Sequence, residues 1–179
     1  ALEGAAYLAI SASDPENLRG VDHGRIVRAQ QASGAALKDF DRLQMCGGFP
    51  WCIASIPIPS WAERVFPEEH GQAAVDKLWD AIFRCVRISG DGKAVERWQA
   101  HLDTLAKRVE KLNALDLDYL HYQAPNGTDF KCWLIPEAQW HGGGDTLPDG
   151  TFFDPNMPTE EVFTSPMRGR CEGTLVSTM

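Results

Sequence analysis

Two long stretches in the middle of the chain place apolar residues three and four positions apart, which is the spacing of one helix face. The first stretch runs from Gln72 to Val86 and the second from Lys93 to Asn113, with Gly90-Asp91-Gly92 as a break between them. The second stretch carries its apolar stripe on Val95, Trp98, Leu102, Leu105, Val109 and Leu112. Stripes of this length have to be buried against other elements, so the sequence predicts two helices that pack on a further layer.

Short apolar runs earlier in the chain predict that layer. Ala6 to Ile10 and Trp51 to Ile56 have the composition of buried strands, and Pro57 ends the second because proline cannot donate to a strand ladder. A helix capped by Asp22 and closed by Gly47-Gly48 is expected between them. The expected fold class is therefore α/β, with helices packed on a mixed sheet.

The pattern changes after Leu115, where apolar and polar residues begin to alternate. A turn at Ala124 to Gly127 joins this strand to another at Thr128 to Ile135, which predicts a hairpin. A turn at Arg168-Gly169-Arg170 and a last strand at Gly173 to Met179 are expected further on. We therefore expect residues 1–114 to form part of an N-terminal α/β domain, and residues 115–179 to form a strand-rich segment that leads into another domain.

Charge and cysteine content limit the kinds of partner and compartment. The 179-residue chain has a formal net charge of −8, which argues against a nucleic acid or an anionic membrane as partner. No apolar run reaches the length of a membrane span. Five cysteines with no Cys-x-x-Cys spacing favour free thiols over disulfides or a zinc knuckle. A cytoplasmic protein is the expected class.

The stretch from Pro155 to Pro166 brings prolines, polar turn residues and two adjacent carboxylates together. Each proline fixes its own φ and restricts the residue before it, so the backbone around Glu160 and Glu161 is unusually predetermined. Two carboxylates held in this way can ligate a divalent metal ion. In the alternative interpretation, Thr159 caps a short helix and both glutamates lie in its first turn, where the helix dipole favours negative charge.

Other local signals for chemistry are incomplete. The glycine run His141-Gly142-Gly143-Gly144 is typical of oxyanion-hole loops, but the chain has no Gly-x-Ser-x-Gly nucleophile motif. The histidines show no metal-ligand spacing, and His101 is expected to be a surface or boundary residue of its helix. A complete metal site cannot be assembled from neighbouring residues of this sequence.

The chain resembles the aminopeptidase T and aminopeptidase S family of two-metal exopeptidases. The resemblance rests on the whole run from Pro155 to Pro166 and on shorter pieces in the family's order: Trp61-Ala62, Val65-Phe66-Pro67, Leu78-Trp79, Ala81-Ile82-Phe83, Trp98 with His101, Gly127-Thr128-Asp129, Trp140 with Gly142-Gly143, and Arg170 with Glu172-Gly173. It covers essentially the entire chain.

This resemblance implies a cytoplasmic, homodimeric metalloaminopeptidase that acts on peptides and uses two divalent metal ions per site. It implies that Glu161 is a metal ligand, with Glu160 as the alternative if the register differs by one. The family's other ligands would follow residue 179, so we expect a fragment that ends early in the catalytic domain and is inactive by itself. The alternative function is a non-catalytic α/β scaffold or dimerisation module.

Overall fold

Residues 4–177 are described by a computed structural model, in which contacts between residues define two compact units. Unit 1 comprises Ala1–Trp98 and Gly144–Pro158, and unit 2 comprises Gln99–Gly143 and Thr159–Met179. Each unit is built from two separate stretches of the chain. The expected division into domains was a single cut along the sequence after residue 114, whereas these units are defined by contacts, so that division stays a prediction.

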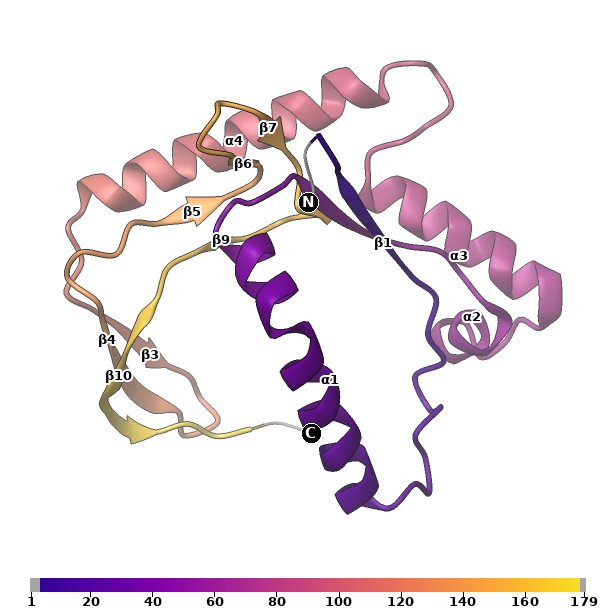
Figure 1. Ribbon diagram of the computed structural model, residues 1–179, viewed down its shortest axis with the longest axis horizontal. Coiled ribbons are helices and arrows are strands. Elements are labelled where there is room, and N and C mark those ends of the chain that lie inside the picture. The colour runs from indigo at the N-terminus through magenta and orange to yellow at the C-terminus, as the bar shows by residue number, and fades with distance from the viewer. Residues whose placement is uncertain (1–3, 178–179) are drawn as a thin grey trace. The chain divides into compact units, whose positions relative to one another are not determined.

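Unit 1 contains a three-stranded parallel sheet with the order β1-β2-β8 (Figure 1). Its strands are β1 (Tyr7–Ser11), β2 (Trp51–Ser55) and β8 (Asn156–Met157). The first two were expected from their apolar runs, but β8 was not. Two residues are too few for a periodic signal, and β8 is a strand because Ile53 and Ala54 pair with it.

The helices of unit 1 begin and end close to their sequence signals. Helix α1 (His23–Met45) is capped by Asp22, whose side chain accepts a hydrogen bond from the Arg25 amide, and Gly47 follows it with a φ of 70°. Helices α2 (Pro59–Val65) and α3 (Gly71–Cys85) pack together through four buried residues, Ala62, Ala74, Val75 and Leu78. This cluster confirms that the predicted apolar stripe of the first long helix is a core face.

Helix α4 (Ala94–Ala114) contains the boundary between the units and buries half of its predicted stripe. Trp98, Leu102 and Leu105 are buried, and Leu105 has no exposed surface. Val95 was expected on the same face but is 83% exposed, because it lies in the first turn of the helix. No helix among residues 4–177 is both long and apolar enough to cross a membrane.

Unit 2 is organised around a three-stranded antiparallel sheet with the order β10-β4-β3. Strands β3 (Tyr119–Gln123) and β4 (Asp129–Leu134) form the predicted hairpin. Strand β10 (Pro166–Thr174) contains the stretch that was expected to be a turn, because an irregularity between Pro166 and Cys171 absorbs Gly169 at a φ of 75°. The predicted terminal strand ends at Thr174, and its last two residues, Thr178 and Met179, lie outside the described residues.

Two further pairs of short strands complete the structure. In unit 2, β5 (His141–Gly142) pairs with β9 (Val162–Phe163) in antiparallel orientation. In unit 1, β6 (Asp145–Thr146) pairs with β7 (Phe152–Phe153). Helices together with parallel and antiparallel sheets confirm the expected α/β class.

Candidate functional site

The acidic segment, defined here as residues Thr159 to Val162, is not helical: its first three residues have no regular secondary structure, and Val162 begins β9. It runs from the end of β8 into β9, so the interpretation of Thr159 as the cap of a short helix is wrong. The reason is tertiary pairing, since β9 is held by β5 and leaves no room for a helical turn before Val162. The two glutamates are therefore presented from a strand end, where a helix dipole cannot account for their charge.

His101 of α4 fixes the start of this segment. Its Nε2 lies 2.6 Å from the carbonyl oxygen of Thr159, and because a carbonyl only accepts, Nε2 carries the proton in this bond. The His101 side chain is only 10% exposed and Thr159 is buried. His101 is thus a part-buried boundary residue of its helix, as expected, and it holds the acidic segment. Its position three residues after Trp98 and four before Leu105, on the buried helix face, was the available signal.

The two glutamates differ in their surroundings. Glu160 Oε2 lies 3.7 Å from His101 Nε2, so this carboxylate faces the helix that holds the segment. Glu161 is exposed, and among residues 4–177 its carboxylate has neither a hydrogen-bond nor an ion-pair partner. A carboxylate without a protein partner is available to bind an added cation. Glu161 meets this condition better than Glu160.

The glycine run predicted as a loop sets how closely the acidic segment can approach. A Cβ atom at position 142 would lie 2.7 Å from the carbonyl oxygen of Glu161 and 2.8 Å from Cγ1 of Val162. Gly143 has a φ of 80°, and a Cβ atom there would lie 3.2 Å from Cδ2 of Leu102. These two glycines let the backbone pass between α4 and the acidic segment. Close packing alone therefore explains the glycine run, without a role as an oxyanion hole.

Two other pieces of the family pattern have structural roles. In unit 1, Trp98 Nε1 donates to Asp154 Oδ2 at 3.1 Å, while Asp154 Oδ1 is buried and has no hydrogen-bond partner among residues 4–177. In unit 2, His121 Nε2 lies 2.6 Å from Asp129 Oδ1, and this contact holds the pKa of the Asp129 carboxyl below its usual range. Thr128 Oγ1 accepts from the Val176 amide at 3.1 Å. Asp129 therefore stabilises the hairpin, and Thr128 holds the segment that follows β10.

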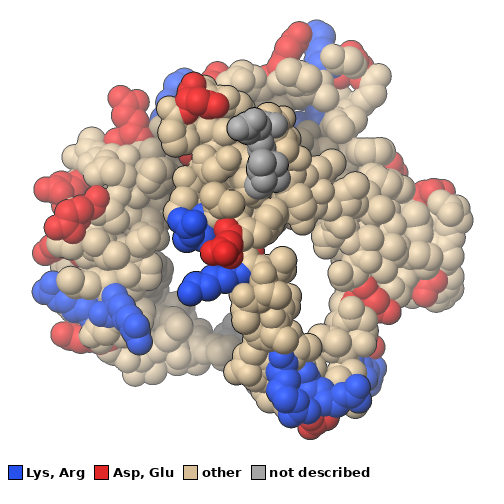
Figure 2. Space-filling model, in the orientation of Figure 1, with Lys and Arg blue, Asp and Glu red and all other residues tan. Residues whose placement is uncertain are grey.

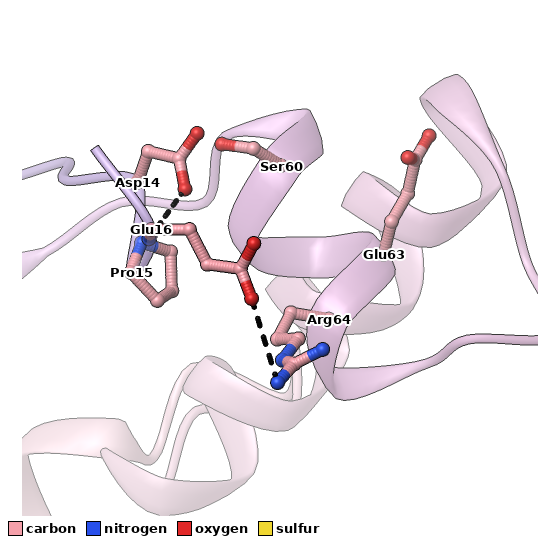
Figure 3. A pocket seen from close by; sticks show the side chains of 6 residues that line it. All are labelled: Asp14, Pro15, Glu16, Ser60, Glu63 and Arg64. Atoms are coloured by element: carbon pink, nitrogen blue, oxygen red, sulfur yellow. Dashed lines mark hydrogen bonds and ion pairs between the residues drawn. The ribbon is translucent and has the colours of Figure 1, made fainter. Parts of the chain in front are cut away.

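A pocket in unit 1 provides a second group of carboxylates, shown in Figure 3. It encloses about 320 Å³ between the turn at Asp14 to Glu16 and helix α2. Glu16 Oε1 pairs with Arg64 at 3.5 Å, and Glu63 Oε1 accepts from the Gly71 amide at 2.8 Å. Asp14 Oδ1 accepts from the Glu16 amide at 2.8 Å. These carboxylates are used internally, so the pocket lacks the free ligands that a cation site requires.

The described residues do not make a metal centre. Within residues 4–177 no group of three or more histidine, cysteine, aspartate or glutamate side chains is close enough to hold an ion. Glu161 alone gives one of the four or more ligands that zinc or a harder divalent ion needs in proteins. The residues present therefore do not fit a complete site, although they present one carboxylate in a fixed backbone.

Comparison with known proteins places this geometry in a family of peptidases. The family model described as thermophilic metalloprotease (M29) matches residues 1–179. The chain is 40% identical over 98% of its length to aminopeptidase 2 of Geobacillus stearothermophilus, and 40% identical over 97% to aminopeptidase T of Thermus aquaticus. A solved structure of wild-type AmpT from Thermus thermophilus is 38% identical, with a TM-score of 0.82 over 95% of this chain.

The chain thus belongs to the M29 family of thermophilic metalloproteases, which confirms the resemblance seen in the sequence. It spans 42% of the length of these two curated relatives and 41% of the solved structure.

Proposed function

We propose that this chain is the part of a metal-dependent aminopeptidase that supplies one ligand, Glu161, to a site for two divalent ions. The remaining ligands belong to polypeptide outside residues 1–179. Its substrate class is peptides with a free N-terminus, and the complete protein is a cytoplasmic homodimer. Membership of the M29 family supports the activity, and the relatives named aminopeptidase support the substrate class.

The observation that carries the choice of residue is the contrast between the two glutamates. Glu160 faces His101, whereas Glu161 is exposed and has no partner among residues 4–177. A side chain that completes an ion site with residues from other polypeptide has to be accessible and without a partner of its own. Glu161 meets both conditions. Its backbone is held by β5 and by the approach that Gly142 permits, so little ordering remains to be done on binding.

The experiment compares Glu161→Gln with Glu160→Gln in the complete polypeptide encoded by the gene. Binding of Co²⁺ or Zn²⁺ is measured by equilibrium dialysis, and cleavage of an amino-acid arylamide is measured in parallel. We expect Glu161→Gln to lose bound metal and activity with an unchanged circular dichroism spectrum. Glu160→Gln, its neighbour of identical chemistry, should keep both. The reverse result would move the ligand to Glu160.

A second candidate function is a non-catalytic scaffold or dimerisation module. The absence of a three-ligand group in the described part of the chain favours it. Under this hypothesis neither glutamate substitution would change metal content or cleavage, and the two variants would behave alike. The same pair of variants therefore separates the two functions.

A further inference from the structure

The turn that joins β3 to β4 carries Asn126, the only asparagine of this chain that precedes a glycine. Asn126 and Gly127 are both exposed, and Gly127 has a φ of 94°. Asparagine is a thermolabile residue, because its side-chain amide carbon can be attacked by the next main-chain nitrogen. A glycine in that next position has no Cβ atom to hinder the attack and leaves the backbone more flexible. The turn therefore contains the pair of residues in which this attack meets least hindrance.

Native hydrogen bonds occupy the groups that would react. The Gly127 amide donates to the Ala124 carbonyl at 3.2 Å. Asn126 Oδ1 accepts from the Thr128 amide at 3.0 Å, and Asn126 Nδ2 donates to the Val176 carbonyl at 3.1 Å. A hydrogen bond to the protonated form of a group opposes loss of its proton, and a side chain bound at both ends has to break both bonds before it can turn. The native turn is therefore held in an unreactive arrangement.

The latch segment, defined here as residues 175–177, completes this arrangement. It follows the last residue of β10 and has no regular secondary structure. The Val176 amide donates to Thr128 Oγ1 at 3.1 Å, so both main-chain groups of Val176 are bound to the turn. Leu175 is 69% exposed and Val176 is 36% exposed, so little apolar burial holds the segment. A segment with few buried contacts opens locally at a low free energy, and here each opening releases the Asn126 side chain.

We propose that Asn126 is a site of spontaneous deamidation and that the latch segment controls its rate. When the latch segment leaves the turn, the Gly127 nitrogen bonds to Cγ of Asn126 and the Cγ–Nδ2 bond breaks. Ammonia leaves with the proton of the Gly127 amide, and a five-membered cyclic imide remains. Water then opens this imide on either side, which yields aspartate or isoaspartate. Water is the only co-reactant, and the proposal does not depend on the metal site.

The product of this reaction no longer holds the latch segment. A carboxylate only accepts hydrogen bonds, so a carboxylate at position 126 has no donor for the Val176 carbonyl. Two oxygen atoms then face each other where Asn126 Nδ2 now donates at 3.1 Å. Isoaspartate also lengthens the main chain of the turn by one carbon atom. Deamidation therefore releases residues 175–177 from the hairpin, and it does so irreversibly because the ammonia is lost.

The experiment incubates the 179-residue chain for several weeks at mildly alkaline pH, folded and in urea, and follows each asparagine by peptide mass spectrometry. Deamidation raises the mass of a peptide by one dalton, and the other asparagines are internal references: Asn17, Asn113 and Asn156. We expect Asn126 to react fastest in urea, and at least about tenfold more slowly in the folded chain because the latch segment is mostly closed. Equal rates in the two conditions, a rate in urea no higher than that of the references, or no modified Asn126 in the folded chain would each overturn the proposal.

A variant pair tests the latch segment directly. Thr128→Val keeps the shape of the side chain but removes the hydroxyl that accepts from the Val176 amide. We expect Asn126 to deamidate about fivefold faster in the folded variant, the effect of losing one hydrogen bond of ordinary strength, and at an unchanged rate in urea. Thr104→Val is the matched control, because the Thr104 hydroxyl bonds within α4, and it should leave both rates unchanged. An unchanged folded rate in Thr128→Val would contradict the proposal.

A product mimic tests the consequence of the reaction, and it does so even if Thr128→Val fails to fold. In Asn126→Asp we expect the Val176 amide to exchange at least about tenfold faster by two-dimensional NMR, because the latch segment is open more often. The Thr128 amide is the internal reference, since a carboxylate at position 126 can still accept from it. Unchanged exchange at Val176 would show that the reaction does not release the latch segment, and would overturn that part of the proposal.

Discussion

At the scale of single residues, the acidic segment depends on a side chain that is far from it in sequence. His101 contacts the Thr159 carbonyl from within α4 and lies near the Glu160 carboxylate. This contact holds the backbone two residues before Glu161. His101 is therefore a positioning residue for the acidic segment.

Substitution of His101 should loosen the acidic segment. In His101→Ala the Thr159 carbonyl loses a donor in a buried position, at a cost of about 1–3 kcal/mol. We expect faster amide exchange at Glu160 to Val162, measured by two-dimensional NMR of the 179-residue chain. His101→Gln, which retains an N–H donor of similar reach, should restore most of the protection. Unchanged exchange in His101→Ala would show that the strand pair alone holds the segment.

At the scale of elements, the pairing of β5 with β9 requires a glycine at position 142. A Cβ atom there would press on the Glu161 carbonyl at 2.7 Å, and this neighbour is backbone that cannot turn aside. The pair consists of only two residues on each strand, so a small displacement is enough to separate it.

We expect Gly142→Ala to lower the free energy of unfolding by about 1–3 kcal/mol, as overpacking in a close contact does. Gly34→Ala is the matched control, because Gly34 lies inside α1 with nothing within 4 Å of its added Cβ. That change should stabilise the protein by up to about 1 kcal/mol through helix propensity. Urea denaturation followed by circular dichroism measures both, and a Gly142→Ala variant as stable as the original chain would contradict the close approach.

The turn before α4 is tied to the helix by charge. Asp91 pairs with Arg97 through both carboxylate oxygens and accepts from the Lys93 amide at 3.1 Å. The hydrogen bond from Arg97, followed by that from Lys93, holds the pKa of the Asp91 carboxyl far below its usual range. A carboxyl with a lowered pKa stabilises the fold above the pKa of about 3.9 that it has when unfolded, and this contribution falls as the pH drops below that value.

This linkage predicts that Asp91→Asn lowers the urea midpoint at pH 7, and that its difference from the original chain narrows as the pH falls from about 5 to 2. The effect should be modest, because the pair is exposed to solvent and screened by salt. Midpoints at several pH values, at low and high salt, provide the measurement. A difference that stays constant with pH would assign the effect to something other than this ionisation.

The sequence predicted the elements whose signals are local. The periodic stripes of α3 and α4, the cap at Asp22 and the hairpin of β3 and β4 follow from spacing and turn residues within a few positions. The conformation of Thr159 to Glu161 could not be predicted in this way, since it depends on pairing with a strand 20 residues away. Nor could the role of His101, because its acceptor is a main-chain atom 58 positions distant. Glu161 as a metal ligand was predicted from family resemblance, and it stays a prediction.

At the scale of the whole molecule, charged side chains of both signs are visible on the face shown in Figure 2. Lysine and arginine lie among aspartate and glutamate on the face shown in Figure 2, and wide uncharged areas separate them. Although the net charge of the chain is −8, the aspartates and glutamates on that face do not form one continuous patch.

The 179-residue chain should be neither active nor stabilised by metal. Because residues 4–177 contain no three-ligand group, we expect no cleavage of an amino-acid arylamide with added Co²⁺ or Zn²⁺. We also expect the Tm to be the same with and without a chelator, since an ion stabilises a fold only if it binds the native state. Robust turnover, or a Tm that falls on chelation, would reveal an ion site built by this chain alone.

The interleaving of the two units along the chain restricts how the protein can be divided. The polypeptide passes between the units after Trp98, after Gly143 and after Pro158. A gene shortened after Ala114 would encode β1 and β2 without β8, the third strand of their sheet. Transferring unit 1 to another protein therefore requires a designed linker that replaces residues 99–143, and no single cleavage by a protease can release it intact.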